Sequence, residues 1–126
     1  MKKITLGLAL SLFAGAAMAD PVEGVWKTET DDGAYAHVNI APCGAALCGH
    51  IARTFNSGGE YKSANIGKKL VWDMQSKGGG SYAGGKIWQP SSNKVYKSKM
   101  SMSGNALNVS GCVGPICKKQ VWTRVK

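Results

Sequence analysis

The sequence has 126 residues and a clear basic excess, with 16 Lys and Arg against 7 Asp and Glu, a formal net charge of +9 at pH 7. Seventeen glycines and only four prolines favour short strands joined by turns. No apolar run beyond residue 19 approaches the roughly 20 residues that a spanning helix needs, and the length excludes a multidomain organisation.

The first 19 residues have the three zones of a secretory signal. Lys2 and Lys3 are followed by an apolar run over residues 6–17 and by Ala17-Met18-Ala19. We predict a signal peptide over residues 1–19, cleaved before Asp20, and one domain over residues 20–126; an uncleaved anchor helix is the alternative. Without Lys2 and Lys3, 14 basic residues remain against 7 acidic ones (16 − 2 = 14), a formal charge of +7.

Apolar residues alternate with a period of two through the exported part, which is typical of antiparallel strands with one buried face. We predict eight strands, at residues 24–28, 34–41, 47–54, 70–75, 82–88, 94–102, 107–111 and 118–124. Residues 56–68 contain glycine, serine and asparagine and are predicted to form a loop or flap.

All four cysteines lie in the exported part, so we predict an oxidising location, the periplasm, and disulfide bonds. Local pairs Cys43–Cys48 and Cys112–Cys117 are favoured, because each pair brackets one hairpin turn and closes a loop worth about 2 kcal/mol in the chain-entropy model. A zinc site with four thiolates is the alternative, which an oxidising compartment disfavours. A redox role is weaker still, because neither pair has Cys-x-x-Cys spacing.

Three turns fix the strand registers of the second half independently: the four-residue turn 90–93, the two-residue turn 104–105 and the cysteine turn 112–117. In the first half, direct opposition of the first cysteine pair would place Ile40 against Ile51. The three later turns agree with one another, because they bring one apolar surface together: Ile87, Tyr96, Met100, Met102, Leu107, Val109 and Trp122.

The two ends of the exported chain carry matching segments, Gly24-Val25-Trp26 and Trp122-Thr123-Arg124. We expect the first and last strands to lie side by side, with the Arg124 guanidinium over the Trp26 indole, so that the sheet closes into a barrel without free edges. This arrangement resembles the calycin signature of lipocalins and fatty-acid-binding proteins.

Segments 43–49, 84–90 and 94–96, with the terminal Trp-Thr-Arg, resemble the secreted bacterial domain-of-unknown-function family 2147. The resemblance covers nearly all of the exported chain. It implies a lipocalin-like, all-β fold, a single closed antiparallel up-and-down barrel of about eight strands. It implies no settled activity.

A barrel of eight strands is either filled by side chains or holds one small ligand. Predicted inward residues at the open end are Trp72, Ile87, Tyr96 and Met100. They are the candidate binding site for a small apolar or amphipathic ligand, with residues 56–68 as the lid. The alternative is a core filled by these same side chains.

The outer face of the strands at 82–88 and 94–102 carries a second candidate site. The predicted register sets Lys86 opposite Lys97 and Trp88 opposite Val95, with Lys99 next along. Because opposed like charges are unfavourable, we predict an anionic envelope lipid or glycan as partner. Lysines that simply extend into water are the alternative. Nucleic acid could use the same charge pattern but is not expected as a partner outside the cytoplasm.

The two histidines, His37 and His50, are predicted on the solvent face, about 13 Å apart. No Ser/His/Asp set or inward carboxylate pair is present. The sequence therefore predicts a non-enzymatic protein without cofactor or metal. Inhibition of lysozyme is a weaker alternative, because lysozymes are commonly basic and would repel this chain.

Overall fold

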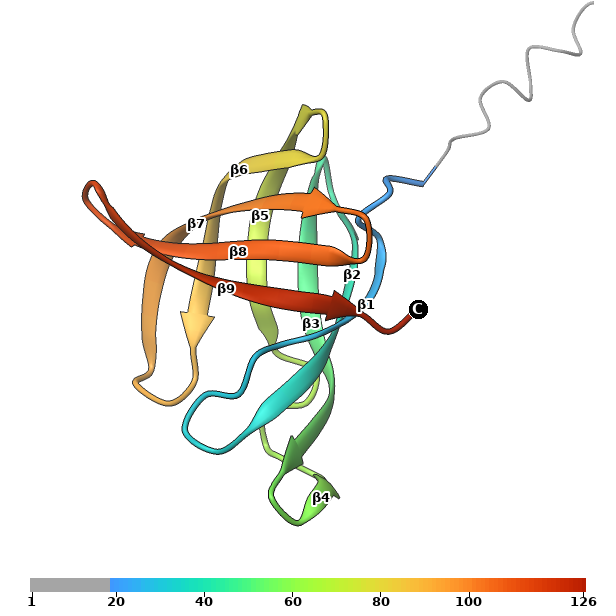
Figure 1. Ribbon diagram of the computed structural model, residues 1–126, viewed down its shortest axis with the longest axis vertical. Coiled ribbons are helices and arrows are strands. Elements are labelled where there is room, and N and C mark those ends of the chain that lie inside the picture. Colours follow the sequence, from blue (N-terminus) through green and yellow to red (C-terminus); the bar gives the residue numbers. More distant parts are fainter. Residues whose placement is uncertain (1–18) are drawn as a thin grey trace, which may run out of the picture.

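The computed structural model describes residues 19–126, and in that range the chain forms strands and turns without a helix (Figure 1). The predicted signal peptide, apart from Ala19, lies outside the described residues. The strands are β1 (Gly24–Lys27), β2 (Tyr35–Cys43), β3 (Ala46–Asn56), β4 (Gly59–Tyr61), β5 (Lys69–Gly78), β6 (Ser81–Gln89), β7 (Lys94–Ser103), β8 (Ala106–Val113) and β9 (Ile116–Arg124).

Eight of the strands form a closed antiparallel barrel. The sheet order is β2-β1-β9-β8-β7-β6-β5-β3-β4, and β2 also pairs with β3, which closes the ring. Short β4 pairs only with β3 and lies outside the ring as part of a protruding hairpin (Figure 1). The prediction of an eight-stranded barrel is confirmed, while the expected loop at 56–68 contains this additional strand.

The barrel closes where β1 meets β9. Trp26 is paired with Arg124, and the guanidinium carbon lies 4.3 Å from the centroid of the indole ring. Trp26 is fully buried and donates its Nε1–H to the carbonyl of Val22, 2.9 Å away. Arg124 also donates to the carbonyls of Pro21 and Glu23, at 2.6 and 3.1 Å. The predicted contact is confirmed, and it also anchors the segment that precedes β1.

The predicted registers of the second half are correct. Ile87 faces Tyr96, Met102 faces Leu107, and Leu107 faces Trp122. The apolar surface predicted from these turns belongs to the hydrophobic core or packs against it. Short turns at 90–93, 104–105 and 114–115 explain this success, because a short connection restricts the register of the two strands that it joins.

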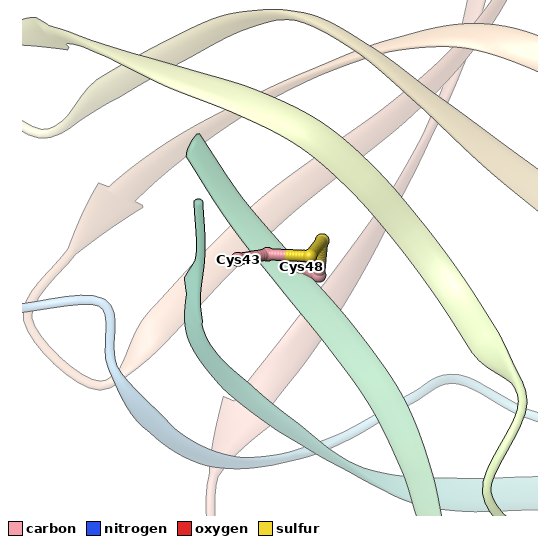
Figure 2. The surroundings of a disulfide bond; sticks show 2 residues. All are labelled: Cys43 and Cys48. Carbon is pink, nitrogen blue, oxygen red and sulfur yellow. A yellow bond between two sulfur atoms is a disulfide. The ribbon is translucent and has the colours of Figure 1, made fainter. Parts of the chain in front are cut away.

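The first hairpin differs from its prediction by two residues. Ile40 faces Gly49, and Ile51 faces Val38. The chain turns at residues 44–45, so Cys43 is paired with Ala46 and the disulfide to Cys48 runs diagonally between the strands (Figure 2). The predicted direct opposition of the two cysteines is therefore wrong. Both predicted disulfides, Cys43–Cys48 and Cys112–Cys117, are present.

An irregularity in β5 reverses the face of Trp72, which was predicted to point inward. Asp73 has a positive φ of 57°, so the alternation breaks there: Val71 and Met74 are buried in the core, whereas Trp72 is only half-buried and is paired with exposed Lys86. On β6, Gly84 has a φ of 81°, and the β6–β7 register shifts by one residue nearby. Bulges of this kind redirect side chains.

Candidate functional site

One end of the barrel contains a cavity of about 740 Å³, within the range of small-molecule sites. The lining combines small side chains with aromatic ones from several strands, and fully buried Trp122 is part of it. The apolar lining is contributed by Ala34, Ala36, Ile51, Leu70, Ile87, Tyr96 and Trp122. The barrel is therefore hollow at this end and filled at the other.

Most buried polar groups in this wall already have partners within the protein. Thr28 accepts a hydrogen bond from the Ala36 amide (3.0 Å) and donates to the Glu29 carbonyl (3.1 Å). Thr54 donates to the carbonyl of Tyr61. Because these hydroxyl groups are satisfied, the inner wall presents a mainly apolar surface to a ligand.

The indole N–H of Trp122 also has a protein partner, which lies on the same strand. Its Nε1–H donates to the Gln120 side-chain oxygen at 2.6 Å. Gln120 and Lys118 precede Trp122 at intervals of two residues on β9 and also border the cavity. Neither was predicted, although the strand period that placed Trp122 inward would have found both.

Two loops border the mouth. The β1–β2 loop reaches the β6–β7 turn, where Ser91 donates a hydrogen bond to the Asp31 carboxylate at 2.7 Å; the two loops lie close together in Figure 1. The segment predicted as a lid, residues 56–68, contributes Tyr61, Ser63 and Asn65 to the rim. The rim of this end is thus formed by at least three segments, the β1–β2 loop, the β6–β7 turn and residues 61–65.

The four predicted ligand-binding residues separate into three groups. Ile87 and Tyr96 line the cavity. Met100 is 3% exposed and belongs to the core without bordering the cavity, so its predicted place at the open end is wrong. Trp72 lies on the outside of the barrel, because the irregularity at Asp73 reverses its face. The cavity is instead completed by residues of the β1–β2 loop, β2, β3 and β9.

The outer face of β6 and β7 has the predicted arrangement. Lys86 is paired with Lys97, and Trp88 with Val95; Lys99 is opposite Ser110 of β8. Trp72 joins this surface, and a shallow groove is formed by Trp72, Trp88, Val95, Lys68 and Lys69. Lys68 Nζ lies 5.5 Å from the centre of the Trp88 ring, a distance suited to a cation–π contact. The predicted strip is therefore wider than expected and contains two indoles.

Neither histidine lies at the cavity. His50 is exposed, and His37 packs beside Phe55, with ring centroids 4.6 Å apart. Burial, with the nearby positive charges of Arg53 and Lys27, lowers the pKa of His37. Among residues 19–126, no three His, Cys, Asp or Glu side chains gather closely enough to hold a metal ion.

Comparison with known proteins gives the family of this chain. The family model described as "Uncharacterized protein conserved in bacteria (DUF2147)" matches residues 24–124, and the chain belongs to this family. No curated protein matches it. In the part of the chain that the structure describes, no helix is sufficiently long and apolar to cross a membrane.

A solved structure supports the lipocalin-like fold. It is described as "Protein HP1028 from the human pathogen Helicobacter pylori belongs to the lipocalin family", and it is similar to this chain with a TM-score of 0.69 and 15% sequence identity. The match covers 86% of this chain and 85% of that one. At this identity the likeness shows the fold alone.

Proposed function

We propose that this protein binds a small apolar or amphipathic molecule inside the open end of its barrel, without catalysing a reaction. The observation that supports this proposal is the combination of a cavity of about 740 Å³ with wall hydroxyl groups that already have protein partners. An apolar ligand would bury its surface there without leaving these groups unsatisfied.

Polar contacts for the head of such a ligand are available near the mouth. The side chain of Tyr96 borders the cavity, as does that of exposed Lys118. In the described part of the chain, the Tyr96 hydroxyl makes no side-chain hydrogen bond. An apolar body with one acidic or hydroxyl-bearing end would match this wall, because a few placed polar groups fix the orientation of a ligand in an apolar site.

Titration with a fatty acid or an environment-sensitive dye tests this function. The wild-type protein should show saturable 1:1 binding. Ala36→Trp places a large side chain in the cavity wall and should abolish binding. Ala52→Trp, at an exposed position of β3, is the matched control and should bind normally. Equal binding by both variants would show that the cavity is not the site.

The outer strip supports a second candidate function, recognition of an anionic envelope lipid or glycan. The observation in its favour is the outward position of Trp72, which adds a second indole to the surface of Trp88, Lys86, Lys97 and Lys99. Lys86→Ser with Lys97→Ser should weaken retention on anionic vesicles or lipopolysaccharide, most clearly at low salt. Unchanged retention would contradict this candidate.

A periplasmic location is also part of the proposal. Two disulfides suggest a protein outside the reducing cytoplasm. The Asp20 nitrogen lies 3.0 Å from a carboxylate oxygen of Glu23, so cleavage before Asp20 would create an ammonium group that faces this carboxylate. Sequencing the N-terminus of the protein recovered from the periplasmic fraction should give Asp-Pro-Val-Glu; any other start would contradict the proposed cleavage.

A further inference from the structure

The basic excess of the exported chain is confined to its last three strands and the residues that follow them. Residues 94–126 contain seven basic side chains and no acidic one, whereas residues 20–93 contain seven of each. The seven basic side chains are Lys94, Lys97, Lys99, Lys118, Lys119, Arg124 and Lys126. One side of the barrel, formed by β7, β8 and β9, thus carries the whole net charge and is suited to an anionic surface.

The β8–β9 hairpin ends in an apolar tip, residues 113–116, on this basic side. Val113 is 67% exposed and Ile116 72% exposed, the highest values among the large hydrophobic side chains of the described residues. The two are paired with each other across the turn. Directly beneath them, Cys112 and Cys117 are paired and joined by a disulfide, so the tip is held as one rigid unit.

The hairpin tip projects beyond its neighbours. The β7–β8 ladder ends at Lys97 and Cys112, and β9 pairs with β1 only through Arg124 and Thr123, at its other end. Figure 1 shows the hairpin extending past the rest of the barrel. Val113 and Ile116 also border the mouth of the cavity. The projecting tip therefore lies at the mouth of the cavity.

We propose that the β8–β9 hairpin docks this protein on an anionic lipid bilayer, with Val113 and Ile116 entering the headgroup layer. Lys118 and Lys119 on β9 would contact the phosphate groups, each lysine strengthening binding by on the order of fivefold. An apolar tip that is followed by two lysines suits a bilayer, which offers anionic headgroups above an apolar layer.

The acidic residues at the mouth define the orientation on the bilayer. Asp31 and Asp32 lie in the β1–β2 loop and border the same mouth, whereas the Glu29 carboxylate of this loop accepts a hydrogen bond from the Val121 amide of β9. An anionic surface repels this loop, so the barrel should tilt with β7–β9 toward the lipid and the β1–β2 loop away from it. The inference uses the charges of the last strands and does not require a ligand in the cavity.

Flotation of the purified protein with vesicles of phosphatidylglycerol and phosphatidylcholine tests the proposal. Wild-type protein should bind vesicles that contain phosphatidylglycerol and be released by high salt. Val113→Ser with Ile116→Ser should weaken binding at least tenfold. Ile66→Ser, the matched control at an exposed position in the β4–β5 loop, should have no effect. Wild-type protein that fails to float would overturn the proposal.

Three more variants distinguish docking on a bilayer from binding to an acidic polymer and from binding through the cavity. Lys118→Ser with Lys119→Ser should weaken binding; if this variant does so but the Val113/Ile116 variant binds normally, the surface recognises an acidic polymer and the bilayer proposal is wrong. Ile116→Trp should add blue-shifted fluorescence that brominated lipid quenches, and unquenched fluorescence would exclude insertion. Ala36→Trp should still float, because a blocked cavity leaves the tip intact.

Discussion

The two ends of the barrel share the same eight strands but differ in how their interiors are filled. At the closed end, Trp26 and Val22 are fully buried and Arg124 covers the indole. At the open end, Ala36 and hydroxyl-bearing Thr28 line a cavity. Since the backbone is continuous between them, side-chain volume determines which end stabilises the fold and which can accept a ligand.

Shortening a buried side chain at the closed end should have the largest effect on stability. Trp26→Ala removes a fully buried indole and the surface on which Arg124 rests, so the free energy of unfolding should fall by about 3–5 kcal/mol. Tyr96→Ala, at the wall of the cavity, should cost about 1 kcal/mol. Urea denaturation measures both, and equal losses would show that the two ends contribute alike.

The two disulfides offer a second comparison, because one lies at each end. Replacing either pair by alanine removes a constraint on the unfolded chain worth about 2 kcal/mol. The Cys43–Cys48 pair should cost more, since Cys48 is buried, whereas Cys117 at the hairpin tip is exposed. Mild reduction followed by alkylation and mass spectrometry should label Cys112 and Cys117 first. Earlier labelling of the buried pair would contradict this view of the two ends.

Gly85 and Gly111 are paired with Ser98 from opposite sides, and they differ in how closely their surroundings are packed. A methyl group at Gly85 would lie 2.5 Å from the carbonyl oxygen of Trp72 and 2.6 Å from the sulfur of Met74, but at Gly111 it would meet no atom closer than 3.4 Å. Gly85→Ala should therefore destabilise the protein by about 1–3 kcal/mol, while Gly111→Ala should be tolerated. Thermal unfolding followed by circular dichroism compares them; similar melting temperatures would show that packing at Gly85 relaxes freely.

The sequence predicted the second half of the barrel better than the first, for identifiable reasons. Short turns fixed the registers of β6 to β9, and the register of β9 placed Trp122 inward. The positive φ of Asp73 has no clear signal in the sequence, because most aspartates have a negative φ even though this residue type is enriched in that conformation. Counting alternate residues through that position assigned Trp72 to the wrong face.

The candidate cavity was predicted only in part, because its volume depends on side chains that several strands and loops contribute at one level of the barrel. Ile87 and Tyr96 were found from their own hairpin. Thr28 comes from the β1–β2 loop, whose conformation strand period does not give. Gln120 lies two residues before inward Trp122 on β9, and the same period would have placed it inward. Strand period alone gives the face of a residue but not its depth in the barrel, which is why Met100 was assigned to the cavity although it lies in the core.

The smallest expected effect is a dependence of stability on pH that comes from His37. His37 lies on the outside of β2 beside Phe55, and its pKa is lowered by burial first and then by Arg53 and Lys27. A histidine that is harder to protonate in the folded chain contributes full stability above pH 6.5, its ordinary value. As the pH falls through that value, the unfolded chain takes up the proton first, so stability decreases.

Urea midpoints measured between pH 7.5 and 5 should therefore decline, and His37→Gln should reduce the decline. Lys27→Met should reduce it in part, because it removes one of the charges that oppose protonation. The Glu60 carboxylate has a pKa lowered by its hydrogen bond to Arg53, so its contribution is lost only below about pH 4.5 and does not enter this window. If the urea midpoint of both variants falls with pH as steeply as that of the wild type, the group that causes the decline is not His37.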